Sequence, residues 1–452
     1  MGATLPKPVD VSVQERHVSK NFRVGLAEVN GWRTSMEDAH VVHFSKTGEG
    51  YFGILDGHGG AQCSAWCAQR LYEELAAKGV PADDAAAKKL ILGIDQQFLD
   101  TCQPSGSTAA MCVVRPPATD GGKYKLHVIN AGDSRVLLSR ENGQIIDGGG
   151  TDSGLTTDHK PDHPGERERI YRCGGTVEEA AGGVSRVNGD LAVSRGFGDA
   201  EYKKTGGPGL ENRPVTSNPE MGHFECGPRD FLMVVCDGVS EGAFPNPQVC
   251  QLAAKVLAQT DGDAAKASEA VCLKAIEAGS KDNISCMIVL MGGGKEATPR
   301  AVGNGGKALK DPQVNTKSVQ LTPGSLLGCK NSNFVKAYSA MCDRGGVPFA
   351  KAAEQRYATL VGRKRTVEAK PDDEEELALI GRPEGADGSP QRAAWFANWA
   401  KQCLEAKNKG DGAGPGGDGD GSDDDQMSQL MMMKMFLMMQ QQRGGGGGGG
   451  RP

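Results

Sequence analysis

The sequence predicts a mixed α and β fold in which strands and helices alternate between residues 22 and 290. Two features indicate it. Apolar runs of strand length, such as 51–55 and 231–236, end at an aspartate that is followed by glycine. Between such runs lie longer segments like 61–76, where apolar residues recur at spacings of three and four, as they do on the packed face of a helix.

The predicted elements follow one another with turn signals between them. Strands are expected at 22–28, 41–44, 51–55, 109–114, 124–129, 136–138, 231–236 and 284–290, and helices at 61–76, 82–102, 164–173, 248–258 and 264–278. Pro164 is typical of a helix start, and Gly174-Gly175 of a helix end. The segment 200–218 is polar and contains Lys203-Lys204, so an exposed flap is expected there.

Composition and charge exclude several classes of protein. The chain has 452 residues, of which 38% are hydrophobic, and a net charge of −6 with a pI near 5.9. This acidic balance argues against a nucleic-acid-binding protein, which needs a basic surface. The 13 cysteines include no C-x-x-C pair, which predicts reduced thiols and a cytoplasmic or nuclear location.

Two features of the sequence bear on membranes. No apolar run is long enough to span a bilayer, so no transmembrane segment is expected. Met1-Gly2 opens as an N-myristoylation signal does, but Pro6 stands where that motif takes Ser or Thr. Acylation of Gly2, with the membrane association that it would bring, is therefore the less favoured interpretation.

The most informative pattern is the position of four aspartates. Asp56, Asp133 and Asp237 follow apolar runs, and Asp282 precedes one. Each alone is consistent with a turn, and the Asp-Gly dipeptides at 56–57 and 237–238 are common in turns. If these strand ends converge, however, the ionised carboxylates could coexist only around divalent cations. Oxygen ligands of this kind favour Mg²⁺ or Mn²⁺ over Zn²⁺.

Other polar residues near these positions could take part in the same chemistry. Gly57 has no side chain to shield its carbonyl oxygen from a metal, and His58 beside it is a candidate proton donor. Glu37 and Asp38 face either solvent or a metal, because adjacent carboxylates repel each other without a cation. Arg33 has the donor geometry for a phosphate, although an arginine near acids more often forms a surface ion pair.

Two further segments contain residues that could bind a ligand, but their local patterns disfavour that interpretation. His159 and His163 are four residues apart, but the prolines at 161 and 164 disfavour a helix that would place both rings on one face. A structural loop is the favoured interpretation of 157–164. The glycine-rich segment 189–199 lacks the preceding strand and following helix of a dinucleotide-binding loop, which excludes a Rossmann interpretation.

Seven short motifs occur in order between residues 20 and 292. They are RTSMED (33–38), GILDGHGG (53–60), GSTA (106–109), NAGDSR (130–135), LAVSRGFGD (191–199), CDG (236–238) and KDNI (281–284). Together they closely resemble the motifs of the metal-dependent type 2C, or PPM, family of protein serine/threonine phosphatases. The resemblance implies a four-layer α-β-β-α sandwich, in which two antiparallel sheets are flanked by helices and the metals lie at one end.

The resemblance also implies which residues would hold the metals, Mg²⁺ or Mn²⁺, with two ions in each active site. Asp56 would bridge the two ions. Glu37 and the carbonyl oxygen of Gly57 would complete the ligands of one ion, and Asp237 and Asp282 those of the other. The pattern as a whole therefore implies a two-metal hydrolase.

Further matches imply roles around these ions. Asp133 matches an acid that helps to hold a weaker third ion in this family. Asp38 and Asn283 would orient the water that attacks phosphorus in line, so that no phosphoenzyme forms. Arg33 would bind the phosphate, and His58 would protonate the leaving oxygen. Supporting positions without an assigned role are matched by Thr108 and Asp199.

The sequence departs from the family pattern at one place near the metal ligands. After Asp237-Gly238 the family usually has a bulky residue and then an aspartate, whereas this chain has Ser240 and the longer acid Glu241. The departure leaves the ligands of the two main ions intact. It puts the packing nearby and the geometry of the third ion in question.

Four regions are predicted along the chain: a phosphatase domain at 1–295, a linker at 296–320, a helical C-terminal appendage at 321–408 and a disordered tail at 409–452. In the appendage, the side chains of Phe349 and Leu360 share one helical face, and a second helix opening at Ser389-Pro390 carries Trp395 and Trp399. These tryptophans are expected in a core or a docking surface.

Two charged or unusual runs complete the C-terminal region. The acidic run 372–376 is expected on a solvated face. The Met-rich segment 427–439 is too short to span a bilayer and is expected to bind a protein partner, with a membrane surface as the second choice.

The sequence thus predicts a monomeric protein phosphatase that acts on phosphoserine and phosphothreonine in phosphoprotein substrates. Two alternatives remain open. A pseudophosphatase would keep the fold as a regulatory binding module, but the complete set of motif residues speaks against it. A two-metal nuclease would use similar ligands, but the acidic net charge and the lack of basic stripes disfavour it.

Overall fold

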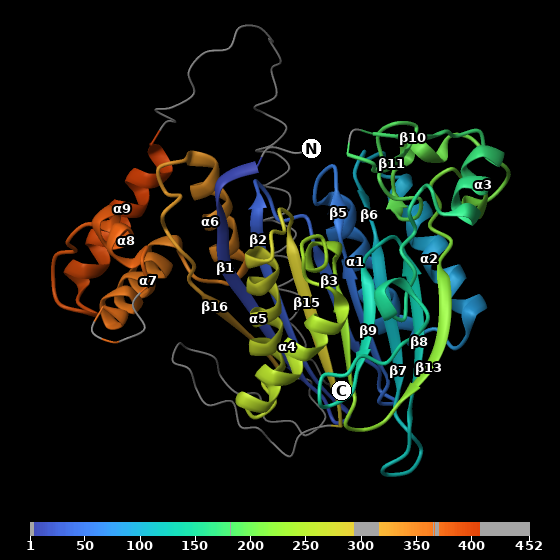
Figure 1. The fold of residues 1–452 in the computed structure, drawn as a ribbon, viewed down its shortest axis with the longest axis horizontal. Coiled ribbons are helices and arrows are strands. Elements are labelled where there is room, and N and C mark those ends of the chain that lie inside the picture. Colours follow the sequence, from blue (N-terminus) through green and yellow to red (C-terminus); the bar gives the residue numbers. More distant parts are fainter. Residues whose placement is uncertain (1–3, 181, 293–315, 365, 367–369, 407–452) are drawn as a thin grey trace, which may run out of the picture. The chain divides into compact units, whose positions relative to one another are not determined.

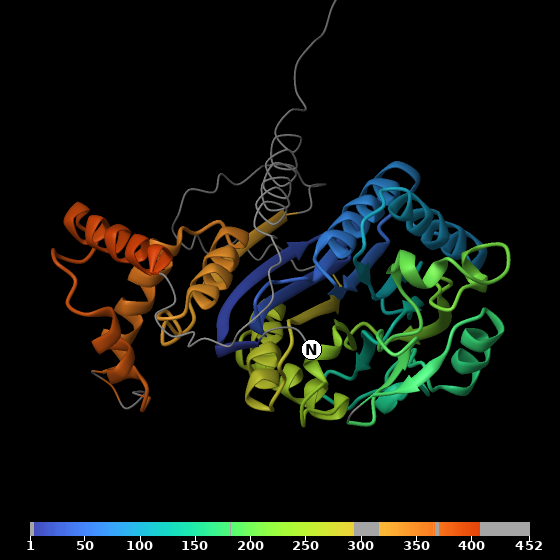
Figure 2. The ribbon, with the colours of Figure 1, turned by 90° about the horizontal axis from the view of Figure 1, so that it is seen from above.

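Two antiparallel β-sheets pack face to face, and helices cover both outer faces (Figures 1 and 2). The computed structural model describes residues 4–180, 182–292, 316–364, 366 and 370–406. The six-stranded sheet has the order β16 (Thr316–Thr322), β1 (Thr4–Val18), β2 (Phe22–Arg33), β15 (Ile284–Met291), β14 (Phe231–Val235), β9 (Arg135–Ser139). The five-stranded sheet has the order β13 (Glu220–Cys226), β8 (Tyr124–Ala131), β7 (Ala109–Arg115), β4 (Gly50–Leu55), β3 (Ala39–Phe44).

The helices form the outer layers. On the five-stranded sheet lie α1 (Gln62–Lys78) and α2 (Asp84–Leu99), and on the six-stranded sheet lie α4 (Asn246–Gln259) and α5 (Ala264–Glu277). With α3 (Pro164–Arg172), these are the five helices predicted before residue 290, and their ends are shifted by no more than three residues. The predicted α-β-β-α sandwich is therefore confirmed.

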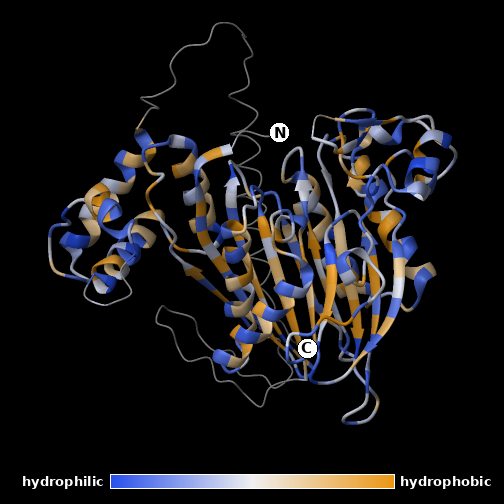
Figure 3. Ribbon diagram, in the orientation of Figure 1, coloured by the Kyte–Doolittle hydropathy of each residue, from blue (hydrophilic) through white to orange (hydrophobic). Residues whose placement is uncertain are grey.

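The alternation of side chains along each strand builds the inner core. Phe22 and Leu26 of β2 point between the sheets and belong to one apolar cluster with Phe52 of β4. Ala27 and Val29, which follow Leu26 on the opposite face of the strand, point into the cluster that includes α4 and α5. Because successive strand residues face opposite sides of a sheet, each central strand must be apolar on both faces, as the hydropathy colouring shows (Figure 3).

Neither β1 nor β16 is predicted from the sequence. Pro6 and Pro8 obscure the strand pattern of β1, because proline has no amide hydrogen for a ladder. Register shifts in the β1–β2 pairing between Thr4 and Ser12 accommodate them, and Ser12 lies opposite Val29 on one side. On its other side β1 pairs with β16, whose residues the sequence divides between the linker and the appendage.

Helices after β16 form the C-terminal region of the described chain: α6 (Ser332–Arg344), α7 (Phe349–Arg363), α8 (Asp373–Ile380) and α9 (Pro390–Glu405). They share an apolar core with β1. The packed faces predicted for α7 and α9 are confirmed, since Phe349 and Leu360 are buried and the ring of Trp399 lies 5.9 Å from that of Phe349.

The expectation that the acidic run 372–376 is solvated is wrong in part. Glu376 is 1% exposed, and both its oxygens accept hydrogen bonds from Arg356, at 2.8 and 2.7 Å. The run begins α8, so helical spacing turns Glu376 toward the core while Glu374 and Glu375 remain exposed.

Several predictions concern segments outside the described residues. Gly2, most of the predicted linker and the Met-rich segment 427–439 are among them. Within the described part of the chain, no helix is both long and apolar enough to cross a bilayer.

Candidate active site

Four predicted aspartates meet at one end of the sandwich. Asp56 follows β4, Asp237 comes two residues after β14, Asp133 lies in the turn between β8 and β9, and Asp282 precedes β15. Burial, and then the negative charges of Asp237 and Asp38, raise the pKa of Asp56 well above its usual value. Burial and the charge of Asp133 do the same for the pKa of Asp237. The carboxylates are thus close enough to repel one another strongly.

The donor set fits a hard divalent cation. Asp38 is 2% exposed, and burial followed by the charge of Asp282 raises its pKa to about 7. Its Oδ2 accepts a hydrogen bond of 2.6 Å from Ser285, but among the described residues its buried Oδ1 has no hydrogen-bond partner. An unpaired anionic oxygen beside Asp56 is costly, and a cation with oxygen ligands removes that cost.

One thiol lies beside these carboxylates. Cys236 offers its Sγ within 4.8 Å of oxygens from Asp38 and Asp56. Burial raises the pKa of this thiol well above its usual value, and Sγ accepts a hydrogen bond of 3.1 Å from the amide of Ser285. Cys236 is therefore a protonated packing residue, which leaves the ligand set composed of oxygens.

Glycine at position 57 lets the loop that carries Glu37 approach Asp56. A Cβ atom on Gly57 would lie 2.4 Å from the backbone oxygen of Glu37 and 2.8 Å from Oγ of Ser64. The Glu37 carboxylate accepts hydrogen bonds from Gly60 N, at 3.2 Å, and from Ser35 Oγ, at 3.0 Å. The structure thus brings Glu37 and the Gly57 backbone together, as predicted.

Asn283 holds the same loop from the other sheet. Its Oδ1 accepts a hydrogen bond of 2.9 Å from the amide of Glu37, and its Nδ2 donates to the backbone oxygens of Asn30 and Ser35, at 2.8 and 2.9 Å. The side-chain amide therefore positions the Glu37 loop relative to the start of β15.

Arg33 forms an ion pair with Asp282, to which its Nη2 donates a hydrogen bond. The Arg33 side chain remains 40% exposed. A guanidinium has five N–H donors, so this contact leaves donors for a phosphate. Arg33 can therefore form an ion pair and also bind a phosphate, so the two interpretations made from the sequence are compatible.

His58 is paired with Asp199, a contact that the sequence did not predict. His58 Nε2 lies 2.8 Å from Asp199 Oδ1. Burial lowers the pKa of His58, but the charge of Asp199 outweighs it, and the net pKa is raised. Both residues crowd Gly106, where a Cβ atom would lie 2.2 Å from Asp199 Oδ1 and 2.3 Å from His58 Nε2. The position therefore requires glycine.

Thr108 links two of the aspartate loops. Its amide donates a hydrogen bond of 2.9 Å to the backbone oxygen of Asp56. Its hydroxyl lies 2.8 Å from that of Ser134, next to Asp133. Thr108 is thus a positioning residue behind the site.

Lys160 was also missed from the sequence. Its ammonium donates a hydrogen bond to Asp133 Oδ2. Burial lowers the pKa of Lys160, but the charge of Asp133 outweighs this and raises it. Any ion bound by Asp133 must share that carboxylate with Lys160 or displace the ammonium.

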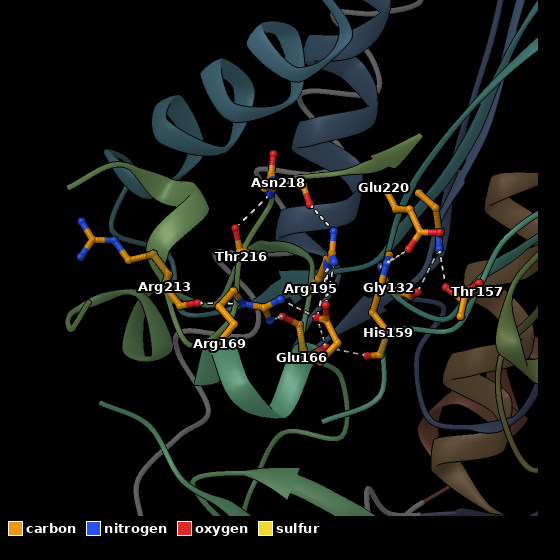
Figure 4. Close-up of polar contacts among 12 residues, drawn as sticks. Gly132, Thr157, His159, Glu166, Arg169, Arg195, Arg213, Thr216, Asn218 and Glu220 are labelled. Atoms are coloured by element: carbon orange, nitrogen blue, oxygen red, sulfur yellow. Dashed lines mark hydrogen bonds and ion pairs between the residues drawn. The ribbon is translucent and has the colours of Figure 1, made fainter. Parts of the chain in front are cut away.

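The loop that carries Lys160 is structural, as predicted. His159 is 2% exposed. Its Nδ1 accepts a hydrogen bond of 3.0 Å from Gly132 N, and its Nε2 lies 3.1 Å from Glu220 (Figure 4). Burial lowers the pKa of His159, in keeping with a neutral ring. The neighbouring His163 is exposed and lies just before α3.

Glu166 of α3 fastens this region to the LAVSRGFGD motif. Its carboxylate accepts hydrogen bonds of 2.6 Å from both Arg169 and Arg195 (Figure 4) and one of 2.5 Å from Ser194. Although burial raises it, these contacts lower the pKa of Glu166 to about 2. Arg169 in turn donates to the backbone oxygen of Arg213 at 3.2 Å, which ties down the predicted flap.

The prediction of an exposed flap at 200–218 is therefore wrong in part. Lys203 is 7% exposed. It donates hydrogen bonds to Asp95 Oδ2, at 2.7 Å, and to the backbone oxygen of Gly196, at 2.8 Å. Lys204 stays on the surface, as predicted. Of the two adjacent lysines, only Lys203 is buried, because it pairs with the buried carboxylate of Asp95.

Glu241 is the residue that departs from the family pattern after Asp237, and its side chain holds the segment that precedes Asp282. Its Oε2 accepts hydrogen bonds from Ser280 Oγ, at 3.2 Å, and from Lys281 N, at 3.1 Å. Those residues lead directly into Asp282. The longer acid thus supports the position of a predicted ligand.

Buried carboxylates that need a divalent cation, beside an arginine and a histidine–aspartate pair, suit the metal-assisted hydrolysis of a phosphate ester. On this sandwich they define the class of metal-dependent phosphatases. Comparison with known proteins gives the family. The model of the family described as protein phosphatase 2C matches residues 22–284.

Named relatives agree with this match. Protein phosphatase 1A of Homo sapiens is 31% identical over 324 residues, covering 67% of this chain and 79% of that protein. Protein phosphatase 1B of Mus musculus is 30% identical over 328 residues, covering 67% and 78%. A crystal structure of a phosphatase from Toxoplasma gondii has the same fold, with a TM-score of 0.56 and 24% identity over 68% of this chain and 99% of that one.

The chain therefore belongs to the protein phosphatase 2C family. It is a metal-dependent protein serine/threonine phosphatase that acts on phosphoproteins. The pseudophosphatase alternative is not favoured.

Proposed function

We propose that this phosphatase uses two Mg²⁺ or Mn²⁺ ions, held as the family resemblance implies by Glu37, Asp56, the Gly57 carbonyl, Asp237 and Asp282. The observation that supports this most is the buried, mutually repelling set of carboxylates, with one oxygen of Asp38 lacking a hydrogen-bond partner within the described chain. Bound ions would supply Lewis-acid neutralisation of the phosphate and a more acidic water.

The side chains around the proposed metal site supply the other roles in the reaction. Arg33 binds phosphate oxygens with the donors that Asp282 leaves free, and so orients phosphorus. The unpaired oxygen of Asp38 accepts a hydrogen bond from the attacking water and orients it. Asn283 keeps the Glu37 loop in place.

His58 then donates a proton to the departing serine or threonine oxygen. Asp199 supports this role in two ways, because its charge favours the protonated imidazole and its Oδ1 fixes the ring through Nε2. The proton must leave from Nδ1 or follow a turn of the ring. General acid help of this kind typically contributes about 100- to 10,000-fold to the rate.

A third ion at Asp133 belongs to the same proposal. Because Lys160 already supplies a positive charge to that carboxylate, we expect this ion to bind more weakly than the other two.

The test of the proposal is hydrolysis of a phosphothreonine peptide by the full chain, with and without Mn²⁺ or Mg²⁺. Turnover is expected only with the cation, and Asp237→Asn should abolish most of it. Absence of metal-dependent turnover in the parent protein would refute the proposal. Cleavage of a phosphodiester without phosphatase activity would support the nuclease alternative instead.

We further propose that the protein works as a monomer in the cytoplasm or nucleus. All 13 cysteines are free thiols, and Cys102 is the exposed one. That pattern suits a reducing compartment. A protein partner of the C-terminal helices and Met-rich tail is proposed on their composition alone. Sedimentation of the purified chain tests the monomeric state, and imaging of a tagged copy tests the location.

A further inference from the structure

A second group of potential metal ligands lies on the helix-covered face of the five-stranded sheet. His127 is in the middle of β8, four residues before the end of the strand. At the rise of an extended chain, that places it roughly 13 Å from the turn that carries Asp133. The group is therefore separate from the aspartate cluster of the active site.

Three elements bring the group together. His127 of β8 and His223 of the edge strand β13 are direct cross-strand partners, and their rings stack with centroids 4.6 Å apart. Asp84 is the first residue of α2. Its Oδ1 lies 2.7 Å from His223 Nε2 and 3.0 Å from His127 Nε2.

An independent observation points to a missing partner. The His127 side chain is 1% exposed. Its Nε2 lies 3.0 Å from Asp84 Oδ1 in an ion-pair contact, but within the described residues neither buried ring nitrogen has a geometrically defined hydrogen-bond partner. A neutral imidazole has a lone pair on one ring nitrogen, and a bound cation would supply the partner that this nitrogen lacks.

We propose that His127, His223 and Asp84 bind a transition-metal ion of the Zn²⁺ class, and that this ion fastens the start of α2 to the β8–β13 edge. Two imidazoles and a carboxylate are a common ligand set for Zn²⁺, with water in the fourth position. The exposed sides of Asp84 and His223, at 54% and 62%, admit that water.

The spacing is compatible with this ion. Ligand atoms about 2.0 Å from a tetrahedral ion are ~3.3 Å apart. The two nitrogen–oxygen distances, 2.7 and 3.0 Å, need to open by only a few tenths of an ångström. The rings of His127 and His223 are stacked and nearly parallel, so the His223 ring must also turn before both nitrogens can bind one ion. The side chains of Asp84 and His223 have room for these changes because both are exposed.

An ion at this site would support, through α2, the loop that carries Asp199. The same helix carries Asp95, which accepts a hydrogen bond of 2.7 Å from Gly198 N and binds Lys203. Gly198 immediately precedes Asp199, the partner of His58. An ion at the start of α2 would therefore stabilise the fold without touching the reacting atoms.

The test measures Zn²⁺ binding by calorimetry while excess Mg²⁺ occupies the active site. His223→Gln and Asp84→Asn are suitable variants because both side chains are exposed, and His163→Gln is the control at an exposed histidine elsewhere. Zn²⁺ affinity should fall at least tenfold in the two variants and stay unchanged in the control. Equal affinity in all four proteins, or no binding to the parent, overturns the proposal.

A second readout identifies the ligands. Cu²⁺ added to the Mg²⁺-saturated protein should show electron paramagnetic resonance couplings to two imidazole nitrogens, because the predicted active-site ligands are all oxygens. His223→Gln should remove one coupling. A spectrum with oxygen ligands only contradicts the proposal. Zn²⁺ should also raise the melting temperature of the parent and leave that of His223→Gln unchanged.

Discussion

Arg344 of α6 and Glu28 of β2 form a two-point ion pair, with Nε and Nη2 of the arginine 2.7 and 2.8 Å from the two carboxylate oxygens. Glu28 is 1% exposed. Nη2 of Arg344 also donates a hydrogen bond of 2.8 Å to the backbone oxygen of Asp38. A C-terminal helix thus supports the segment that places Glu37 and Asp38 at the active site.

Substituting Arg344 with glutamine should destabilise the whole protein and not only the C-terminal helices. The change leaves the Glu28 carboxylate buried with His40 as its remaining partner. Removing one member of a buried ion pair typically costs about 3–5 kcal/mol. We expect a loss of about 3 kcal/mol in the free energy of unfolding, measured with urea, together with weaker Mn²⁺ binding.

The matched control is Lys351→Gln, which breaks an ion pair of the same length, 2.7 Å, to Glu354 at a partly exposed position on α7. It should cost less than about 1 kcal/mol. Adding Glu28→Gln to the Arg344 variant should restore part of the lost stability. Equal losses in the Arg344 and Lys351 variants would show that the buried pair has no special role.

His40 extends the same network and should make stability depend on pH. Burial lowers the pKa of His40, but the charges of Glu28 and Glu15 outweigh burial and raise it to about 9. A group whose pKa is raised on folding contributes stability that is complete below its unfolded pKa, near 6.5, and is lost as the pH rises through its folded pKa. The free energy of unfolding should therefore fall between pH 6.5 and 9, by up to about 3 kcal/mol.

Urea unfolding at several pH values in that window measures the slope, and His40→Gln should flatten it. His43 on the same strand is the control, because burial lowers its pKa and it therefore cannot produce a loss in this range. A slope that persists in His40→Gln, or disappears in His43→Gln, would assign the dependence to another group.

Much of the fold and site could be predicted because their signals are local. Asp56 and Asp237 each follow an apolar run directly, so the strand and the carboxylate are visible in one short window. Arg344 gives no such signal, since its contact with Asp38 spans 306 residues. Glu28 looks like a solvated strand residue until β1 and α6 cover it.

Lys160 and Lys203 show the same limit on a smaller scale. The local sequence pattern predicted a loop around each lysine, and the structure confirms a loop around Lys160. What fixes each lysine is a buried carboxylate far along the chain, Asp133 for one and Asp95 for the other. Charge pairs of this kind depend on tertiary contacts, which no spacing rule encodes.

The pairing of His58 with Asp199 predicts a dependence on the leaving group. His58→Gln should slow hydrolysis of a phosphothreonine peptide much more than that of a nitrophenyl phosphate, whose leaving group needs little protonation. Asp199→Asn should act in the same direction, since it removes the charge that raises the pKa of His58. In Asp199→Asn, the pH at which peptide hydrolysis begins to fall should also move down.

Steady-state rates on the two substrates from pH 6 to 9 check this. The informative quantity is the ratio of the two losses, which a general defect in folding or metal binding would leave near one. Equal losses on both esters would exclude His58 as the proton donor.

Lys160 should limit how strongly a cation binds at Asp133. Its ammonium occupies one oxygen of that carboxylate, so Lys160→Met removes a positive charge that a third ion would otherwise have to displace. We expect the weakest Mn²⁺ site to tighten about tenfold, equivalent to ~1.4 kcal/mol, while the two tighter sites change little. Lys160→Arg, which keeps the charge, is the control. Counting free Mn²⁺ by electron paramagnetic resonance measures all three sites, and a weakest site unchanged in Lys160→Met would mean that Asp133 binds no ion in competition with Lys160.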